Sequence, residues 1–160
     1  MRLSLLQYTA EASVSDSEAR LYPLLQQAIS DNPDVIVLPE CALFLSTSQS
    51  ASRDAALTMD SEPVARLAAF ANAHAVWLVV GSLIMSVNGV VTNRQLVFNR
   101  AGDLVQTYDK LHLFDVQLAS GETYRESALF TRGTDPALVD IEGVPVGLSF
   151  YTFQTLGYTI

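Results

Sequence analysis

The chain has 160 residues, 49% of them hydrophobic, which is enough for one globular domain with a sizeable core. Its formal net charge is −8, from 17 acidic and 9 basic residues without a dense Lys/Arg cluster, which argues against a nucleic-acid partner. The longest nearly continuous apolar stretch, residues 76–85, is well short of the roughly 20 residues that cross a bilayer, so no membrane span is expected.

The start of the chain indicates where in the cell the protein is located, and its one cysteine and two histidines limit the kinds of metal or disulfide site it could form. Residues 2–8 form a strand-like pattern with no signal-peptide pattern before it, so we expect a cytoplasmic protein. The single cysteine, Cys41, cannot form an internal disulfide, and His74 and His112 lie too far apart to suggest a metal site. We therefore expect neither a metal nor another cofactor.

Two helices are predicted in the first half of the chain. The first begins at a capping-box pattern of Ser15 and Glu18 and ends near Asp31, with apolar residues at helical spacing between them. The second begins at Asp60 and closes near His74, and it carries a second apolar stripe. Both helices should therefore pack one face on a core.

The predicted strands are short apolar runs separated by turn residues. In chain order they are residues 2–8, 35–38, 76–85, 90–99, 104–108, 137–141 and 144–149. The pairs Asn88-Gly89 and Ala101-Gly102 separate three consecutive strands, which is typical of hairpins. A strand-helix-strand start followed by a meander predicts an α/β fold with a mixed sheet.

Three charged residues stand out because they follow or interrupt these apolar runs. Glu40 comes just after the strand at 35–38, at the carboxyl end where α/β folds place their ligands. Lys110 follows the strand at 104–108, and on a continuing strand it would share a face with His112. Glu126 lies in a polar loop. Taken singly, each is better explained as a surface charge, so only their combination suggests a site.

The segments around these residues resemble the nitrilase superfamily of carbon-nitrogen hydrolases in order and spacing. They are Val-Leu-Pro-Glu-Cys at 37–41, Tyr-Asp-Lys-Leu-His-Leu-Phe-Asp-Val at 108–116 and Tyr-Arg-Glu-Ser at 124–127. The likeness is greatest to the branch with omega-amidase and deaminated-glutathione amidase. It implies a nitrilase-type α-β-β-α sandwich with a mixed sheet, and a homo-oligomer in the full-length family form.

The resemblance also implies roles for the three charged residues. Glu40 matches the general base, Lys110 the lysine that stabilises the oxyanion, and Glu126 the second glutamate, which orients the lysine and the substrate. With a cysteine nucleophile, such a group hydrolyses the C–N bond of a small linear amide and releases ammonia without a metal. The expected partner is therefore a small-molecule amide.

The fourth member of the catalytic group is missing from the sequence. Aligning Gly147 with the glycine of the family's Gly-x-x-Ile-Cys-Tyr-Asp motif puts Tyr151 at the nucleophile position, and a phenol is a poor acyl-transfer nucleophile beside a thiol. We expect residues 1–149 to be the N-terminal part of a carbon-nitrogen hydrolase domain, incomplete at its C-terminus, and 150–160 to be a divergent tail. Two alternatives stay open: a hydrolase that is inactive in this form, or a non-catalytic product that acts by binding or assembly.

Two further residues are expected to be structural. Cys41 directly follows Glu40, so on an extended chain their side chains would point to opposite faces, and a free cysteine commonly behaves as a small buried hydrophobe. Asn93, in the strand at 90–99, is interpreted as an ordinary polar strand residue. Neither is therefore counted among the candidate site residues.

Overall fold

The computed structural model describes residues 1–117, 121 and 123–148. Its elements in chain order are β1 (Leu3–Leu5), α1 (Val14–Ile29), β2 (Val35–Val37), α2 (Gln49–Asp54), α3 (Glu62–His74), β3 (Trp77–Val87), β4 (Val90–Phe98), β5 (Leu104–Asp109), β6 (Asp115–Gln117), β7 (Thr123–Arg125), the 3₁₀ turn η1 (Glu126–Ala128), β8 (Ala137–Ile141) and β9 (Val144–Leu148). Tyr151 and the expected tail at 150–160 lie outside the described residues.

Five strands form one mixed sheet in the order β1-β2-β3-β4-β5. The first three are parallel, as the intervening helices α1 and α3 allow, whereas β3, β4 and β5 form the antiparallel meander that the sequence predicts. Asn88 and Gly89 both have positive φ angles in the turn between β3 and β4, which explains the choice of these two residues there.

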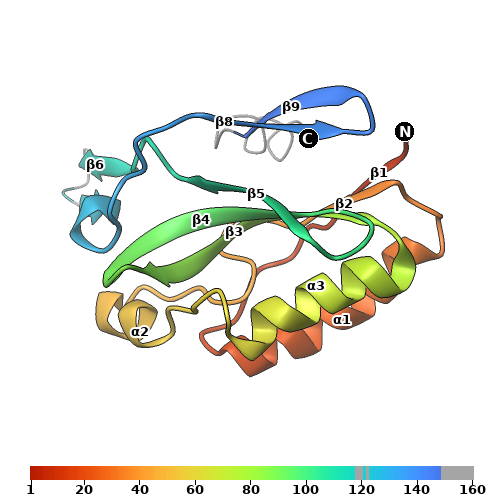
Figure 1. Ribbon diagram of the computed structural model, residues 1–160. Helices are drawn as coiled ribbons and strands as arrows, with labels where there is room; N and C mark the ends of the chain where they lie inside the picture. Colours follow the sequence, from red (N-terminus) through yellow and green to blue (C-terminus); the bar gives the residue numbers. More distant parts are fainter. Residues whose placement is uncertain (118–120, 122, 149–160) are drawn as a thin grey trace.

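Helices α1 and α3 lie side by side on one face of this sheet (Figure 1). Their apolar stripes meet the sheet in the main core, which includes Leu21, Leu25 and Leu67. The predicted capping box is wrong in detail, because the N-cap of α1 is Ser13, whose Oγ accepts from the Asp16 amide. Glu18 does not reach back along its own helix; its carboxylate pairs with Arg66 of α3 at 2.6 Å and ties the two helices together.

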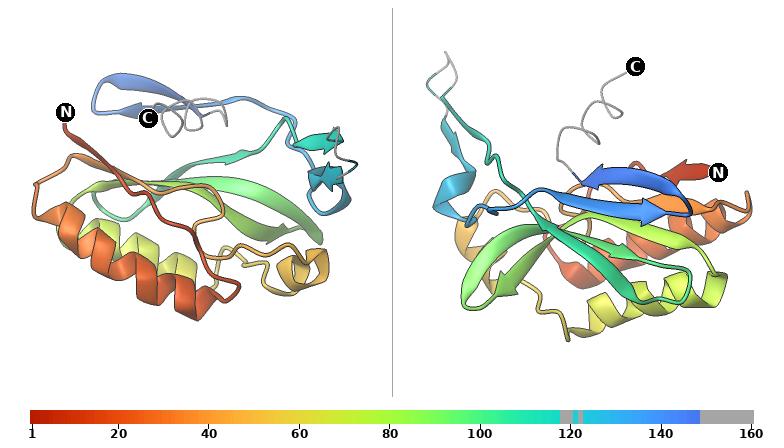
Figure 2. Two further views of the ribbon diagram at one scale, coloured as in Figure 1. Left: turned by 180° about the vertical axis from the view of Figure 1, so that it is seen from behind. Right: turned by 45° about the horizontal axis from the view of Figure 1, so that its top comes forward.

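The hairpin of β8 and β9 lies over the other face of the sheet, as both views in Figure 2 show. A second apolar cluster fills the space between them, with Val79 and Val97 from the sheet and Val139 and Ile141 from β8. The described residues thus form helix, sheet and sheet layers in succession, in agreement with the predicted α/β nitrilase-like fold with a mixed sheet. Within the described part of the chain, no helix has the length and apolarity needed to cross a bilayer.

The short elements between the main strands were not predicted from the sequence. Helix α2 and the paired strands β6 and β7 lie at the same end of the sheet (Figures 1 and 2), where Arg53 of α2 donates to the Ala128 carbonyl at 2.7 Å. The strand expected to carry both Lys110 and His112 ends at Asp109. Beyond it, the side chain of Lys110 is buried whereas that of His112 is exposed. The two residues therefore do not share a strand face.

Candidate active site

A tight backbone contact determines where Glu40 leaves the sheet. Strand β2 ends at Val37, and the chain then passes against Gly81 of β3, whose amide donates to the Leu38 carbonyl at 3.1 Å. A Cβ atom at Gly81 would collide with that carbonyl oxygen and with the backbone of Pro39. Only glycine allows this approach, which brings Glu40 to the carboxyl end of the parallel strands.

The chain turns sharply at the next residue, Cys41. Its φ of 51° lies in the left-handed region, and its amide donates to the Ser82 Oγ at 2.8 Å. This turn ends the extended geometry, so Glu40 and Cys41 line the same pocket and do not point to opposite faces as the sequence suggested. Burial and the nearby Glu40 carboxylate raise the pKa of the Cys41 thiol to about 12, and the thiol packs in an apolar cluster with Phe44, Ile84 and Phe130.

Lys110 lies directly after β5, and its side chain is only 4% exposed. Its amide donates to the Asn93 carbonyl of β4 at 2.9 Å, which extends the sheet pairing by one residue. The ammonium Nζ lies 2.7 Å from Glu126 Oε2 and 3.3 Å from Glu40 Oε1. One buried cation therefore contacts two carboxylates from distant parts of the chain.

Glu126 is held by the β6–β7 hairpin. It is the first residue of η1, its carboxylate Oε2 accepts from the Phe114 amide at 2.7 Å, and its own amide donates to the Phe114 carbonyl at 3.2 Å. The hairpin is closed beside it by the pairing of Asp115 with Arg125. Because the Glu126 carboxylate is fixed by both backbone and ion pair, it can orient the Lys110 ammonium.

The environment of Glu40 favours its neutral form more than water does. Burial raises the pKa of the Glu40 carboxyl, and the positive charge of Lys110 and a hydrogen bond from Asn93 oppose that shift. A carboxyl group with a raised pKa binds a proton more readily at neutral pH than an ordinary surface glutamate. This is the property that a general base requires.

A pocket of about 620 Å³ adjoins both glutamates, a volume within the range of small-molecule sites. Residues of α2 and of β7 line it, and Figure 1 shows α2 and β6 at the same end of the sheet. Arg125 is the one arginine among its lining residues. Much of the wall is apolar and is formed by Leu45, Ile84, Phe114, Leu129 and Phe130.

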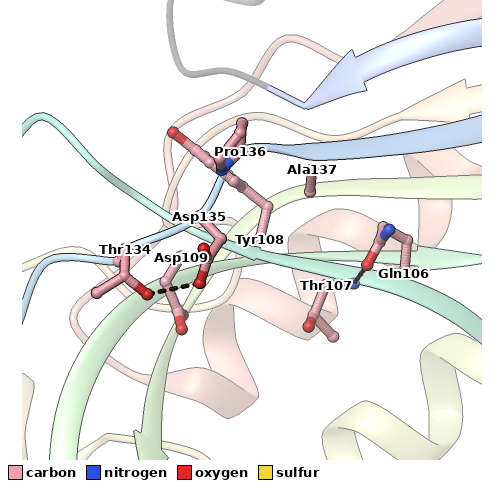
Figure 3. Close-up of a pocket in the computed structure, with 9 residues that line it drawn as sticks. Gln106, Thr107, Tyr108, Asp109, Thr134, Asp135, Pro136 and Ala137 are labelled. Atoms are coloured by element: carbon pink, nitrogen blue, oxygen red, sulfur yellow. Dashed lines mark hydrogen bonds between the residues drawn. The ribbon is translucent and has the colours of Figure 1, made fainter.

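A smaller cavity of about 250 Å³ lies between β5 and the segment 133–137 (Figure 3). Its two carboxylates already have partners: Asp135 accepts from the Thr134 hydroxyl at 2.7 Å, and Asp109 pairs with Arg94 at 2.6 Å. None of the three predicted site residues lines it. Across the described residues, no group of three or more His, Cys, Asp or Glu side chains is arranged to hold a metal ion.

The three charged residues singled out from the sequence thus come together, although 70 residues separate Glu40 from Lys110. Asn93 was missed as a neighbour of the site. Its Nδ2 donates to Glu40 Oε1 at 2.8 Å, and its side chain is buried. It is one of four consecutive polar residues, 92–95, in β4, so nothing in the sequence distinguished it from its neighbours.

Comparison with known proteins agrees with this geometry. Residues 2–151 match the carbon-nitrogen hydrolase family. The chain belongs to the carbon-nitrogen hydrolase family. The resemblance to the nitrilase superfamily is confirmed, and the chain spans about half the length of the curated relatives it matches.

Two curated relatives and one solved structure illustrate the similarity of this chain to known proteins. It is 29% identical to the deaminated glutathione amidase of Dictyostelium discoideum, over 92% of this chain and 54% of that protein. It is 28% identical to an omega-amidase of Mus musculus, over 92% of this chain and 53% of the relative. A CN-hydrolase superfamily protein from Xanthomonas campestris superposes with a TM-score of 0.76 at 26% identity, covering 91% of this chain and 51% of that one.

Proposed function

We propose that this chain carries the site of an amidase-type carbon-nitrogen hydrolase, which cleaves the C–N bond of a small linear amide and releases ammonia. The observation that supports this most is the burial of Lys110 between Glu40 and Glu126, whose carboxylates line a pocket of about 620 Å³. Two of the similar proteins carry the name amidase, which agrees with this class of reaction.

The proposed reaction divides the work among the three residues and a thiol. The thiol sulfur attacks the amide carbonyl carbon, ammonia leaves, and water then hydrolyses the thioester to the acid. Glu40 takes the proton from the thiol and passes it to the leaving nitrogen. Lys110 stabilises the negative charge that develops on the carbonyl oxygen, and Glu126 keeps the lysine oriented.

We further propose that the chain as it stands does not hydrolyse amides, because Tyr151 takes the nucleophile position. This proposal depends on the sequence alignment, since Tyr151 lies outside the described residues. The single cysteine does not replace it, since Cys41 is 9% exposed and its pKa is raised to about 12, so its thiolate is scarce at neutral pH.

A non-catalytic role is the second candidate, and the same state of Cys41 favours it. Without an available thiolate, the pocket beside Glu40 would still recognise a carboxamide, and the chain would act by binding or by assembly with partners. The cytoplasmic location and the homo-oligomer of the full-length family form stay predictions from the sequence.

Ammonia release from succinamate and from an α-keto amide, measured on the chain and on its Tyr151→Cys variant, separates the two candidates. We expect the chain and its Glu40→Ala variant to release ammonia equally slowly. Activity of the unaltered chain above that control would refute the proposed inactivity. Activity gained in Tyr151→Cys and lost again in the double variant with Glu40→Ala would support the hydrolytic roles directly.

A further inference from the structure

Asn93 connects the two charged residues at the centre of the candidate site. Its side-chain Nδ2 donates to Glu40 Oε1 at 2.8 Å, and its backbone carbonyl accepts from the Lys110 amide at 2.9 Å. It lies in β4, between β3 and β5, and is only 1% exposed. Because the Asn93 side chain is buried in a central strand, it can fix the position of its partner.

The distances indicate that Asn93 holds Glu40 more firmly than Lys110 does. The bond from Asn93 is 2.8 Å long, whereas the Lys110 ammonium is 3.3 Å from the same oxygen and 2.7 Å from Glu126. At 3.3 Å a charged hydrogen bond is long, so of the two carboxylates Glu126 holds the lysine more closely. Glu40 therefore depends on the amide of Asn93 for its orientation.

The same contacts distinguish the two oxygens of the Glu40 carboxylate. Asn93 and Lys110 both approach Oε1, and within the described part of the chain no hydrogen bond to Oε2 is found. A proton on Oε1 would compete with both donors, whereas a proton on Oε2 would leave both contacts in place. Glu40 also lines the pocket of about 620 Å³, where an incoming group would give up its proton.

We propose that Asn93 is a positioning residue for Glu40: it occupies Oε1 and so leaves Oε2 as the oxygen that accepts the proton. This inference rests on the proposed role of Glu40 as the general base. Asn93 itself does not touch the reacting atoms in this scheme. It acts by keeping the carboxylate turned toward the pocket and by stabilising the charged form of Glu40.

The buried amide Gln95 provides a matched control. It lies two residues further along β4, on the same face of the strand, and is 2% exposed. Among the described residues it makes no hydrogen bond to Glu40. Asn93→Leu and Gln95→Leu each replace a buried side-chain amide by an apolar group of similar size. Only Asn93→Leu removes a hydrogen-bond donor to Glu40.

A carbon-13 NMR pH titration of the glutamate side chains tests the proposal without any turnover, so its result is independent of amide hydrolysis. The signal of Glu40 is identified by its loss in Glu40→Gln. We expect Asn93→Leu to raise the pKa of Glu40 by about one unit, a roughly tenfold change in proton affinity, and Gln95→Leu to leave it within about 0.3 units.

Two results would overturn the inference: an unchanged Glu40 pKa in Asn93→Leu, or an equal rise in Gln95→Leu. Should Asn93→Leu not fold, Asn93→Ser takes its place, because serine is too short to reach Glu40 and the same rise is expected. A shifted Glu40 pKa together with no amide binding in a separate titration would refute the proposed function and leave the role of Asn93 intact.

Discussion

Replacing Lys110 by methionine should destabilise the fold at neutral pH, because the carboxylates of Glu40 and Glu126 would lose the cation they share. The Lys110 side chain is 4% exposed, and removing one partner of a fully buried ion pair costs about 3–5 kcal/mol. Glu40 and Glu126 are 33% and 24% exposed, so water screens part of their charge. We therefore expect a loss of about 2–3 kcal/mol, or a fall in Tm of roughly 4–12 °C.

Urea denaturation followed by the fluorescence of Trp77, the single tryptophan, measures this loss. It should be largest near pH 7 and smaller near pH 4, because burial raises the pKa of Glu40 and that carboxyl then binds a proton. The control variant combines Lys110→Met with Glu40→Gln and Glu126→Gln, and it should recover most of the stability because no unpaired charge is left. An equal loss in the single and triple variants, or a loss that does not change with pH, would refute the reasoning.

Three further outcomes follow from the site. Cys41, with a pKa of about 12, should have a thiolate fraction of about 10⁻⁴ at pH 8. Iodoacetamide should therefore label Cys41 at least 1,000-fold more slowly in the native protein than in urea. Equal labelling rates would contradict the burial of Cys41. Gly81→Ala should cost about 1–3 kcal/mol by thermal denaturation, whereas Gly147→Ala, with its nearest neighbour at 3.7 Å, should be nearly neutral. The folded pKa of Glu40 is raised above 4.5, so the ionisation of Glu40 opposes folding. The stability of Glu40→Gln relative to the unaltered chain should therefore increase as pH rises from about 4.5 through that pKa. A stability difference that does not change with pH would contradict the raised pKa.

The main sheet was predictable because its strands carry unambiguous signals. Residues 90–92 are β-branched, residues 96–98 are apolar and the run follows an Asn-Gly turn, and the structure places a strand there with nearly the predicted bounds. Helix α2 was missed because Gln49–Asp54 is short, polar and rich in serine. Its helical conformation is stabilised by packing at the end of the sheet that carries the site, which the local sequence does not indicate. The three-residue strands β6 and β7 offer too few residues for a periodic pattern.

The site was predictable only through its resemblance to a known family. Nothing in the local sequence indicates that Lys110 is buried, since a lysine after a strand is usually a surface residue. Its burial results from Glu40 and Glu126, which reach it from other parts of the chain. The contact of Asn93 with Glu40 likewise spans 53 residues, and it depends on the strand order of the sheet and on the path of the chain past Gly81 after β2.

A titration of the nitrogen-15-labelled chain with succinamate tests most directly whether the pocket beside these charges is an amide site. We expect saturable shifts centred on the backbone amides of Lys110, Phe114 and Glu126, and their loss in Lys110→Met at a pH where that variant is folded. Shifts that do not saturate, or that persist unchanged in Lys110→Met, would contradict this expectation.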